Sequence, residues 1–333
     1  MSMGAHVWLA LLAGCSLCSG TVLAQTATTE KIRVLTLLGR PLQIIVAETH
    51  GMFARRGIAV ETDNSGSSDE MRAKLAEGKG DVAYAAVDNA VAMVELAGVD
   101  VIIVGGGEGS QNELFVQPGI KTIPELRGKT LIVDAVKTAY ALQMKKILLL
   151  NGLQPGDYEL KAVGVTPMRL AVMREHKEYA GSMLGPPTSI LARRAGFVSL
   201  GAVPDLIGPY QAAGSFAQRA WAKEHRDILV NYLAGFIEAQ RWLMNPTNRD
   251  AAIELMIKEQ HLPADVAAEA YILYMTKPGG FEKDTQVDLD GLRNVLKLRA
   301  EVEGQWGGHA PSPEKYYDAA YYQAALGKVK EAQ

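Results

Sequence analysis

Cysteine is scarce in this chain, which has Cys15 and Cys18 and none after residue 18. Both lie in the segment from Met1 to Ala24, which also lacks Lys, Arg, Asp and Glu. If that segment is removed, no thiol remains, and this excludes a thiol nucleophile, a disulfide and a cysteine-ligated metal. Long hydrophobic runs are also missing, because no later stretch reaches the roughly 18 apolar residues of a membrane span.

The segment from Met1 to Ala24 reads as a cleaved export signal. Its apolar stretch, Val7 to Cys18, is about half the length of a bilayer span and is followed by small residues leading to Ala24. Only His6 and the α-amino group supply positive charge at the start. A second interpretation is a lipoprotein signal, because residues 12–15 (Leu-Ala-Gly-Cys) resemble a lipobox that would place lipid on Cys15. We expect cleavage after Ala24, an exported protein and a periplasmic location.

No charge of one sign dominates, since 34 Lys and Arg oppose 37 Asp and Glu for a net charge of −3. The basic residues are scattered, so no positive field is available to attract nucleic acid. With 48% hydrophobic and 21% charged residues the chain is neither disordered nor fibrous. We expect a globular protein that does not bind nucleic acid.

Motifs for catalysis, cofactors and metals are absent. The glycine-rich run at residues 101–110 (VIIVGGGEGS) follows a predicted strand, but a dinucleotide fingerprint needs glycine where Ser110 stands. No P-loop, zinc-protease or nucleophile-elbow motif occurs, and the six histidines lack metal-ligand spacing. We therefore expect no catalytic residue, no metal ligand and no cofactor, and we do not expect an enzyme.

Short β-rich runs alternate with helical stretches from Lys31 onward, a pattern typical of parallel α/β architecture. Strands are predicted at residues 32–38, 58–63, 81–87, 99–106, 130–135, 158–163, 178–184 and 197–201. Connections near residues 113–122 and 204–215 divide the chain into two similar α/β halves with a cleft between them. One larger doubly wound sheet is the alternative.

The region after Ser215 is predicted to be mostly helical. One apolar face carries Leu229, Leu233, Phe236, Ile237 and Met244, and a terminal helix is expected near residues 314–326. A second face has nearly the same period and carries Leu289, Leu292, Val295, Leu296, Arg299 and Val302.

Small and polar residues recur where the predicted strands meet helices. In open α/β sheets ligands bind beyond the carboxyl ends of the strands, where helix N-termini offer unpaired N–H groups. Ordinary helix capping explains each junction alone, and Ser67 with Glu70 has capping-box spacing. Their recurrence in both halves favours a site for a small anion. The candidate ligand-binding residues are Gly39, Arg40, Ser65, Ser67, Ser68, Asp88, Asn89, Lys137, Thr138, Tyr140, Gly185 and Tyr210.

Several of these candidates have a second interpretation. Arg40 could pair with a carboxylate or sulfonate or be solvated in a turn, and Lys137 stands at an anion-friendly helix start. Tyr140 fits the apolar stripe of its helix, so it could pack in the core or stack on a ligand. Tyr210 follows Pro209 and could close over a ligand or pack in the hinge; Gln111 and Asn112 occupy the outward connection.

From Ile32 to about Ala325 the chain resembles the substrate-binding proteins of bacterial ABC importers, in the sulfonate, nitrate and thiamine-precursor group of type II periplasmic binding proteins. The segments that carry the resemblance are residues 44–61 (IIVAETHGMFARRGIAVE), 80–92 (GDVAYAAVDNAVA), 125–153 (ELRGKTLIVDAVKTAYALQMKKILLLNGL) and 232–246 (YLAGFIEAQRWLMNP). The first and third are the more specific.

The resemblance implies an α/β, two-lobed type II periplasmic-binding-protein fold. The first lobe would be discontinuous and comprise residues 25–115 and 213–333, and the second lobe would comprise residues 116–212. It also implies a monomer that captures a small ligand and docks on a membrane permease. The family's ligand positions fall on Gly39 and Arg40, residues 65–68, Asp88 and Asn89, and residues 137–140.

The chain departs from the family at two places. Residues 175–180 (EHKEYA) replace a Gly-x-x-Asp-Ala element, and residues 135–140 (AVKTAY) carry less Gly and Ser than usual. We therefore expect a larger organic acid, a sulfonate or a carboxylate, held by Lys137 or Arg40. Two alternatives are an enzyme of this fold acting on a pyrimidine precursor or an aromatic acid, and a solute sensor for a membrane receptor.

Overall fold

The computed structural model describes Met1 and residues 29–37, 39–276 and 278–331, so residues 2–24 of the predicted export signal lie outside the described residues. The strands are β1 (Glu30–Thr36), β2 (Ile58–Asn64), β3 (Val82–Ala86), β4 (Val101–Gly109), β5 (Glu113–Val116), β6 (Thr130–Val133), β7 (Glu159–Ala162), β8 (Tyr179–Leu184), β9 (Val198–Ala202) and β10 (Gln211–Gln218). The helices are α1 (Leu42–Thr49), α2 (Ser68–Ala76), α3 (Asp88–Ala97), α4 (Ala139–Leu150), α5 (Thr166–Glu175), α6 (Thr188–Arg194), α7 (Val203–Ile207), α8 (Arg219–Glu224), α9 (Arg226–Met244), α10 (Arg249–Gln260), α11 (Ala264–Thr276), α12 (Leu289–Glu303) and α13 (Ala319–Glu331).

One five-stranded sheet has the order β2-β1-β3-β10-β4, and the part of the molecule built on it is called lobe 1. β1 runs parallel to β2, with Glu30 opposite Ile58, and parallel to β3. β10 runs antiparallel to both β3 and β4. The apolar start of β4, residues 101–104, is buried because helices cover both faces of the sheet.

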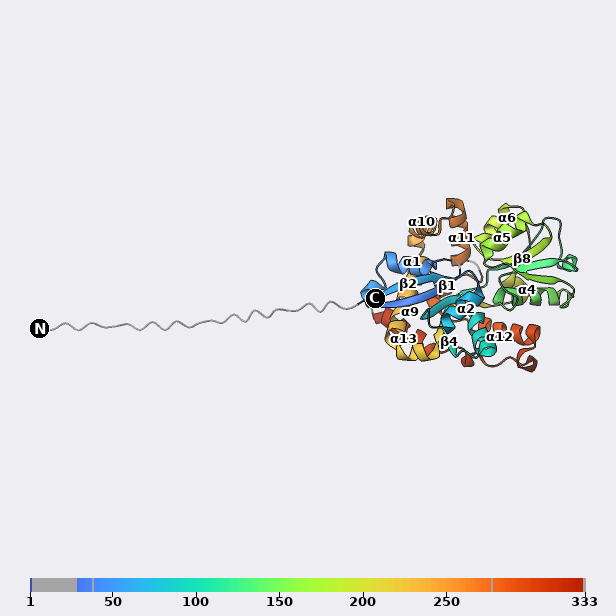
Figure 1. Ribbon diagram of the computed structural model, residues 1–333. Coiled ribbons are helices and arrows are strands. Elements are labelled where there is room, and N and C mark those ends of the chain that lie inside the picture. The colour runs from blue at the N-terminus through green and yellow to red at the C-terminus, as the bar shows by residue number, and fades with distance from the viewer. Residues whose placement is uncertain (2–28, 38, 277, 332–333) are drawn as a thin grey trace.

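A second five-stranded sheet has the order β7-β6-β8-β5-β9 and forms lobe 2. β6 is parallel to β7 and β8, whereas β5 is antiparallel to β8 and β9. Figure 1 shows the two lobes beside each other, with β8 and helices α4, α5 and α6 in lobe 2. The two sheets make the fold the two-lobed α/β type that was predicted, and the alternative of one larger sheet is wrong.

Both predicted connections contain a strand that the sequence reading missed. β5 belongs to the second sheet, so the predicted boundary after residue 115 falls inside a strand, and the chain crosses before Glu113. β10 starts at Gln211 and belongs to the first sheet, so the return crossing also ends before the predicted boundary at residue 213. Each crossing strand is buried in the middle of its lobe, where Phe115 and Phe216 are fully buried.

The two predicted apolar helix faces are confirmed for most of their residues. Leu229, Leu233, Phe236 and Ile237 of α9 are buried, and α9 packs against α1 and α13. On α12, Leu292, Val295 and Leu296 are buried, while Leu289 at the first position is exposed. The last described helix, α13, docks on α9 as expected for a terminal helix.

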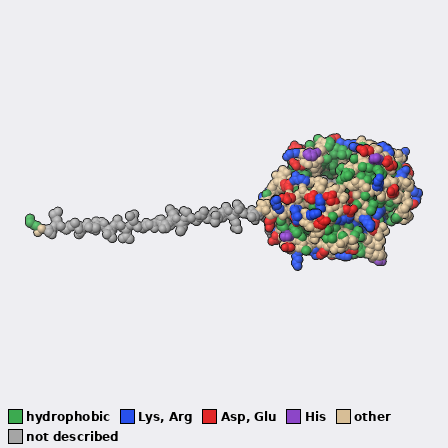
Figure 2. Space-filling model, in the orientation of Figure 1, with side chains coloured by type: hydrophobic (Ala, Val, Ile, Leu, Met, Phe, Trp, Pro, Cys, Tyr) green, Lys and Arg blue, Asp and Glu red, His purple; other side chains and the backbone are tan. Residues whose placement is uncertain are grey.

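None of the helices within the described residues is long and apolar enough to cross a bilayer. Figure 2 shows Lys and Arg side chains intermixed with Asp and Glu side chains over the visible face. This mixture agrees with the near balance of charges in the sequence.

Candidate ligand-binding site between the lobes

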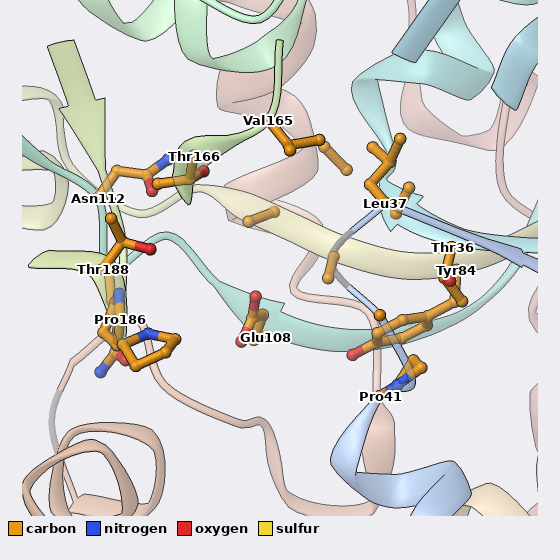
Figure 3. A pocket seen from close by; sticks show the side chains of 18 of the residues that line it. Thr36, Leu37, Pro41, Tyr84, Glu108, Asn112, Val165, Thr166, Pro186 and Thr188 are labelled. Carbon is orange, nitrogen blue, oxygen red and sulfur yellow. The ribbon is translucent and has the colours of Figure 1, made fainter. Parts of the chain in front are cut away.

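A cavity of about 560 Å³ lies between the two lobes. Its walls are the segments that follow the carboxyl ends of β1, β2 and β3 in lobe 1 and of β6, β7 and β8 in lobe 2. Figure 3 shows Thr36, Leu37, Pro41 and Tyr84 on one side of the cavity and side chains from lobe 2 on the other. The cavity thus occupies the place where open α/β sheets bind ligands.

The first turns of five helices of eight or more residues line this cavity, and the shorter α6 adds Thr188. They contribute Leu42 of α1, Ser68 of α2, Asn89 of α3, Ala139 of α4 and Thr166 of α5. The first N–H groups of a helix have no intrahelical partner and carry the positive end of the helix dipole. Five such ends around one cavity make it a favourable place for a negatively charged group.

The structure brings seven of the twelve predicted site residues together on the wall of this cavity. They are Gly39, Arg40, Ser68, Asn89, Thr138, Tyr140 and Gly185. Gly185 allows a close approach, because a Cβ there would lie 2.7 Å from Oδ1 of Asn112. Asn112 also lines the cavity, and its amide donates to Oε1 of Gln143 at 2.9 Å.

The other five predicted residues lie outside the cavity wall, and each has a structural reason. The carboxylate of Asp88 is taken by Arg299, whose Nε donates to Oδ1 at 2.5 Å. Lys137 is exposed and contributes its backbone carbonyl to Arg299, at 3.5 Å. Ser67 caps α2 by accepting the N–H of Glu70 at 3.2 Å, while the Glu70 carboxylate accepts the N–H of Gly66 at 2.9 Å rather than that of Ser67. Ser65 and Tyr210 are buried in the protein beside the wall.

Arg40 lines the cavity, but its charge is already neutralised. Its guanidinium pairs with Glu48 and lies 3.6 Å from Oε2 of Glu259. Lys137 is outside, so neither cation that the sequence analysis selected is free in the cavity. The expectation that Lys137 or Arg40 holds an acid therefore needs correction.

Arg169 of α5 supplies the positive charge that the sequence reading missed. Its side chain is buried in the cavity wall and donates to oxygens of Ser182, Gly164, Thr166 and Met183 at 2.6–3.2 Å. No carboxylate of the described residues forms an ion pair with it, and burial lowers its pKa. All these hydrogen-bond partners are neutral, and the nearby carboxylate of Asp134, which acts to raise the pKa, offsets only part of the effect of burial.

Glu108 projects into the middle of the cavity from the end of β4 (Figure 3). Burial raises the pKa of its carboxyl from 4.5 to about 7. Gly107 precedes it, and a Cβ at Gly107 would collide with the hydroxyl of Tyr84. The sequence signal for Glu108 is an acidic residue at the end of an otherwise apolar and glycine-rich strand.

Hydrogen bonds and ion pairs connect the lobes around the cavity. The hydroxyl of Ser68 donates to Oδ2 of Asp134 at 2.9 Å, from α2 to the segment after β6. The hydroxyl of Tyr274 in α11 donates to the carbonyl of Pro186 at 2.8 Å. At the periphery, Arg194 of α6 pairs with Asp265 of α11 at 2.5 Å. The lobes are thus held together in the arrangement that encloses the cavity.

Metal chemistry has no candidate site within the described part of the chain. The described residues contain no cluster of three or more His, Cys, Asp or Glu side chains able to hold a metal ion. The site is therefore defined by helix N-termini, one buried guanidinium, one buried carboxylate and several aromatic rings.

Two α/β lobes with a cavity between them make up the periplasmic-binding-protein fold. A family model described as NMT1/THI5 like matches residues 41–235, more than half of the chain. The chain belongs to the NMT1/THI5-like family. The predicted resemblance is thereby confirmed at the level of family and fold, and no curated protein matches the sequence.

Solved structures with the same fold include three binding proteins. The periplasmic nitrate-binding protein NrtA of Synechocystis is 12% identical with a TM-score of 0.75, covering 91% of this chain and 89% of that chain. The alkanesulfonate-binding protein SsuA of Xanthomonas axonopodis, bound to MOPS, is 15% identical with a TM-score of 0.69, covering 87% and 98%. The aliphatic sulphonate-binding protein SsuA of Escherichia coli is 19% identical with a TM-score of 0.67, covering 86% and 91%.

Proposed function

We propose that this protein is an extracytoplasmic solute-binding protein that captures a small organic anion, a sulfonate or a carboxylate, and delivers it to the permease of an ABC importer. The observation that carries the proposal is the set of five helix N-termini around one cavity between two lobes. Unpaired N–H groups pointing at one volume stabilise a negative charge there.

Arg169 strengthens this preference for an acid. A buried guanidinium without a carboxylate partner raises the electrostatic potential of the volume beside it, and the field is strong where protein excludes water. An anionic group at the lobe 2 wall, near Thr166, lies within the influence of Arg169 and the start of α5, whereas the Thr138 hydroxyl is already bonded to the Asp134 carboxylate.

The size and lining of the cavity favour an organic ligand over a bare inorganic anion. About 560 Å³ is room for a molecule with a carbon skeleton, and Tyr84, Tyr140, Tyr274 and Phe281 contribute aromatic surface to the wall. A bare anion would leave most of this surface without contacts. An aromatic or extended aliphatic acid would fill it.

Capture works by closure of the lobes over the ligand. A ligand that contacts both walls favours the closed form by the contacts it makes only there. The bond between Ser68 and Asp134 and the bond between Tyr274 and Pro186 form in the closed form and add to this preference. The closed, loaded protein is then the form that docks on the permease.

The relatives support the class of function that is proposed. Neighbours of this fold are named as nitrate-binding and sulfonate-binding proteins, and a further one is named as the ligand binding component of an ABC-type import system from Staphylococcus aureus. We propose by analogy that the chain is exported through the segment from Met1 to Ala24, acts as a monomer in the periplasm and needs no cofactor.

A thermal-shift screen against sulfonates, aliphatic and aromatic carboxylates, nitrate and pyrimidines tests the proposal. A ligand at a hundred times its dissociation constant adds about 2.7 kcal/mol of stability. An organic acid that stabilises the protein and is recovered unchanged supports the proposal. Chemical conversion of the stabilising compound would support the enzyme alternative. Stabilisation by uncharged pyrimidines alone would contradict the proposal that the ligand is an organic anion.

A docking experiment distinguishes a binding protein of an ABC importer from a solute sensor for a membrane receptor. We expect the ligand-loaded protein to bind a permease in a membrane preparation and to stimulate its ATPase. Binding of the loaded protein to a receptor ectodomain, without stimulation of any ATPase, would favour the sensor.

A further inference from the structure

Glu108 stands among three tyrosines that come from different elements. Tyr84 lies on β3, Tyr140 on α4 and Tyr274 on α11, and all three line the cavity with Glu108. Burial, followed by the nearby carboxylate of Glu108, raises the pKa of each phenol, so all three remain neutral. Glu108 therefore faces aromatic rings and hydroxyls that bring no positive charge.

The carboxylate of Glu108 has neither a hydrogen bond nor an ion pair with any of the residues that the structure describes. An unpaired carboxylate of this kind lowers the stability of the folded protein when it is ionised, because an ionised group removed from water needs a partner. The other acids of the cavity differ: Asp134 accepts from Ser68 and Thr138, and Glu259 pairs with Arg40. Glu108 is the acid for which the protein itself provides no counterpart among the described residues.

Other oxygens on the cavity wall are also left unpaired. Asn89 donates its amide to the carbonyl of Ala86 at 3.1 Å, and Gln111 donates its amide to the carbonyl of Leu273 at 2.6 Å. The Oδ1 of Asn89, the Oε1 of Gln111 and the hydroxyl of Tyr84 have no hydrogen-bond partner in the described part of the chain. The two amide oxygens are acceptors that a donor on a ligand can satisfy, whereas the Tyr84 hydroxyl can either donate or accept.

We propose that Glu108, Tyr84, Tyr140 and Tyr274 form a subsite for an alkylammonium group of the ligand, called here the Glu108 subsite. An ammonium brings three N–H donors and a positive charge, which match an unpaired carboxylate and acceptor oxygens. Tyrosine rings around it add cation–π attraction. The inference rests on the proposed function and sharpens it: the ligand is an amino acid in the broad sense, with its acidic group toward the helix N-termini and its amine toward Glu108.

Matched pairs of ligands test this subsite by calorimetry. The probes are 4-(aminomethyl)benzoate against 4-methylbenzoate, and straight-chain ω-amino carboxylates and ω-amino sulfonates against the same acids without the amino group. A charge-assisted hydrogen bond gives about 10- to 100-fold in affinity. We expect the best amino member to bind the wild-type protein at least about tenfold more tightly than its partner.

The variant Glu108→Gln should abolish this preference while still binding the acid without the amine. Glu259→Gln is the matched control, because Glu259 also lines the cavity but already pairs with Arg40, so the preference for the amine should persist. Thermal unfolding of both variants checks that they are folded.

The possible failures are distinguishable. If the acids bind and the amine adds nothing, or if Glu108→Gln keeps the preference, the subsite is refuted while the proposed function stands. If amines bind without any acidic group, the subsite stands and the anion proposal fails. If no member of any pair binds the wild-type protein, both proposals are wrong.

Discussion

Asp88 and Arg299 form a buried ion pair across 211 residues of chain, with Nε to Oδ1 at 2.5 Å and Nη2 to Oδ2 at 2.8 Å. Asp88 is 0% exposed and Arg299 is 1% exposed. The pair fastens the start of α3 to α12, and Arg299 also reaches the carbonyl of Lys137 at the start of α4. Two helix N-termini of the cavity are therefore positioned by one arginine that lies outside it.

Removing that arginine should destabilise the protein strongly. Arg299→Ala leaves the Asp88 carboxylate buried without a partner, and breaking a buried pair in this way costs about 3–5 kcal/mol. Urea unfolding measures the loss. Arg293→Ala is the control on the same helix, because its pair with Asp290 is exposed and should be worth less than about 1 kcal/mol. Equal losses in the two variants would contradict the assigned role of Arg299.

Substitutions of the two serines at the start of α2 should distinguish an effect on stability from an effect on closure of the lobes. Ser67→Ala removes the cap of α2 and should lower the free energy of unfolding by about 1 kcal/mol without changing ligand affinity. Ser68→Ala removes the bond to Asp134 in the other lobe and should weaken binding about 2- to 10-fold. Calorimetry and unfolding on both variants check this. Loss of affinity in Ser67→Ala, with none in Ser68→Ala, would mean that Ser68 has no part in closure.

Lys137→Ala should leave affinity for an organic acid within about twofold, because this side chain is exposed and is not part of the cavity wall. Thr138→Val is the comparison at the adjacent position. Its hydroxyl donates to Oδ1 of Asp134 at 2.5 Å on the wall of the cavity, and we expect weaker binding. A large loss of affinity in Lys137→Ala would instead support the original expectation that Lys137 binds the acidic group of the ligand.

Glu108 should make the ligand-free protein less stable as the pH rises. Its pKa is about 7 in the folded protein against 4.5 ordinarily, so the folded state binds more protons between these values. Stability from this group is present below pH 4.5 and is lost as the pH rises through about 7, to the extent of about 1–3 kcal/mol.

The difference between wild type and Glu108→Gln isolates this effect from other titrating groups. Denaturant unfolding of both proteins across this pH range should show a gap that changes with pH in the stated direction. A constant gap would mean that the pKa of Glu108 is the same in the folded and the unfolded protein, and it would contradict the prediction. The other described ionisable groups on the cavity wall are Arg40, Tyr84, Asp134, Tyr140, Arg169, Glu259 and Tyr274.

The sequence predicted most strands because their apolar runs follow simple periodicity. It missed β5 and β10 because each lies in a connection between the lobes, where short runs such as Glu113–Val116 resemble a linker. Both strands run antiparallel to their neighbours, unlike the parallel strands of βα units. They are therefore defined only by pairing with strands that are distant in the sequence. Periodicity alone contains no information about such pairing.

The candidate site was predictable to the extent that it depends on strand ends. Gly39, Ser68, Asn89 and Thr138 follow predicted strands and do line the cavity. Asp88 did not, because its partner Arg299 is distant in sequence and looked like one more residue on the face of a helix. Arg169 and Glu108 were missed because burial turns ordinary charged residues into the main electrostatic features of the site.

The most direct test of the central claim is equilibrium dialysis of the purified protein against the panel of organic acids, with mass spectrometry of what is retained and of its chemical state. We expect an organic acid to be retained at one molecule per chain and to be released unchanged on denaturation. Retention of no acid, or release of a converted product, would contradict it.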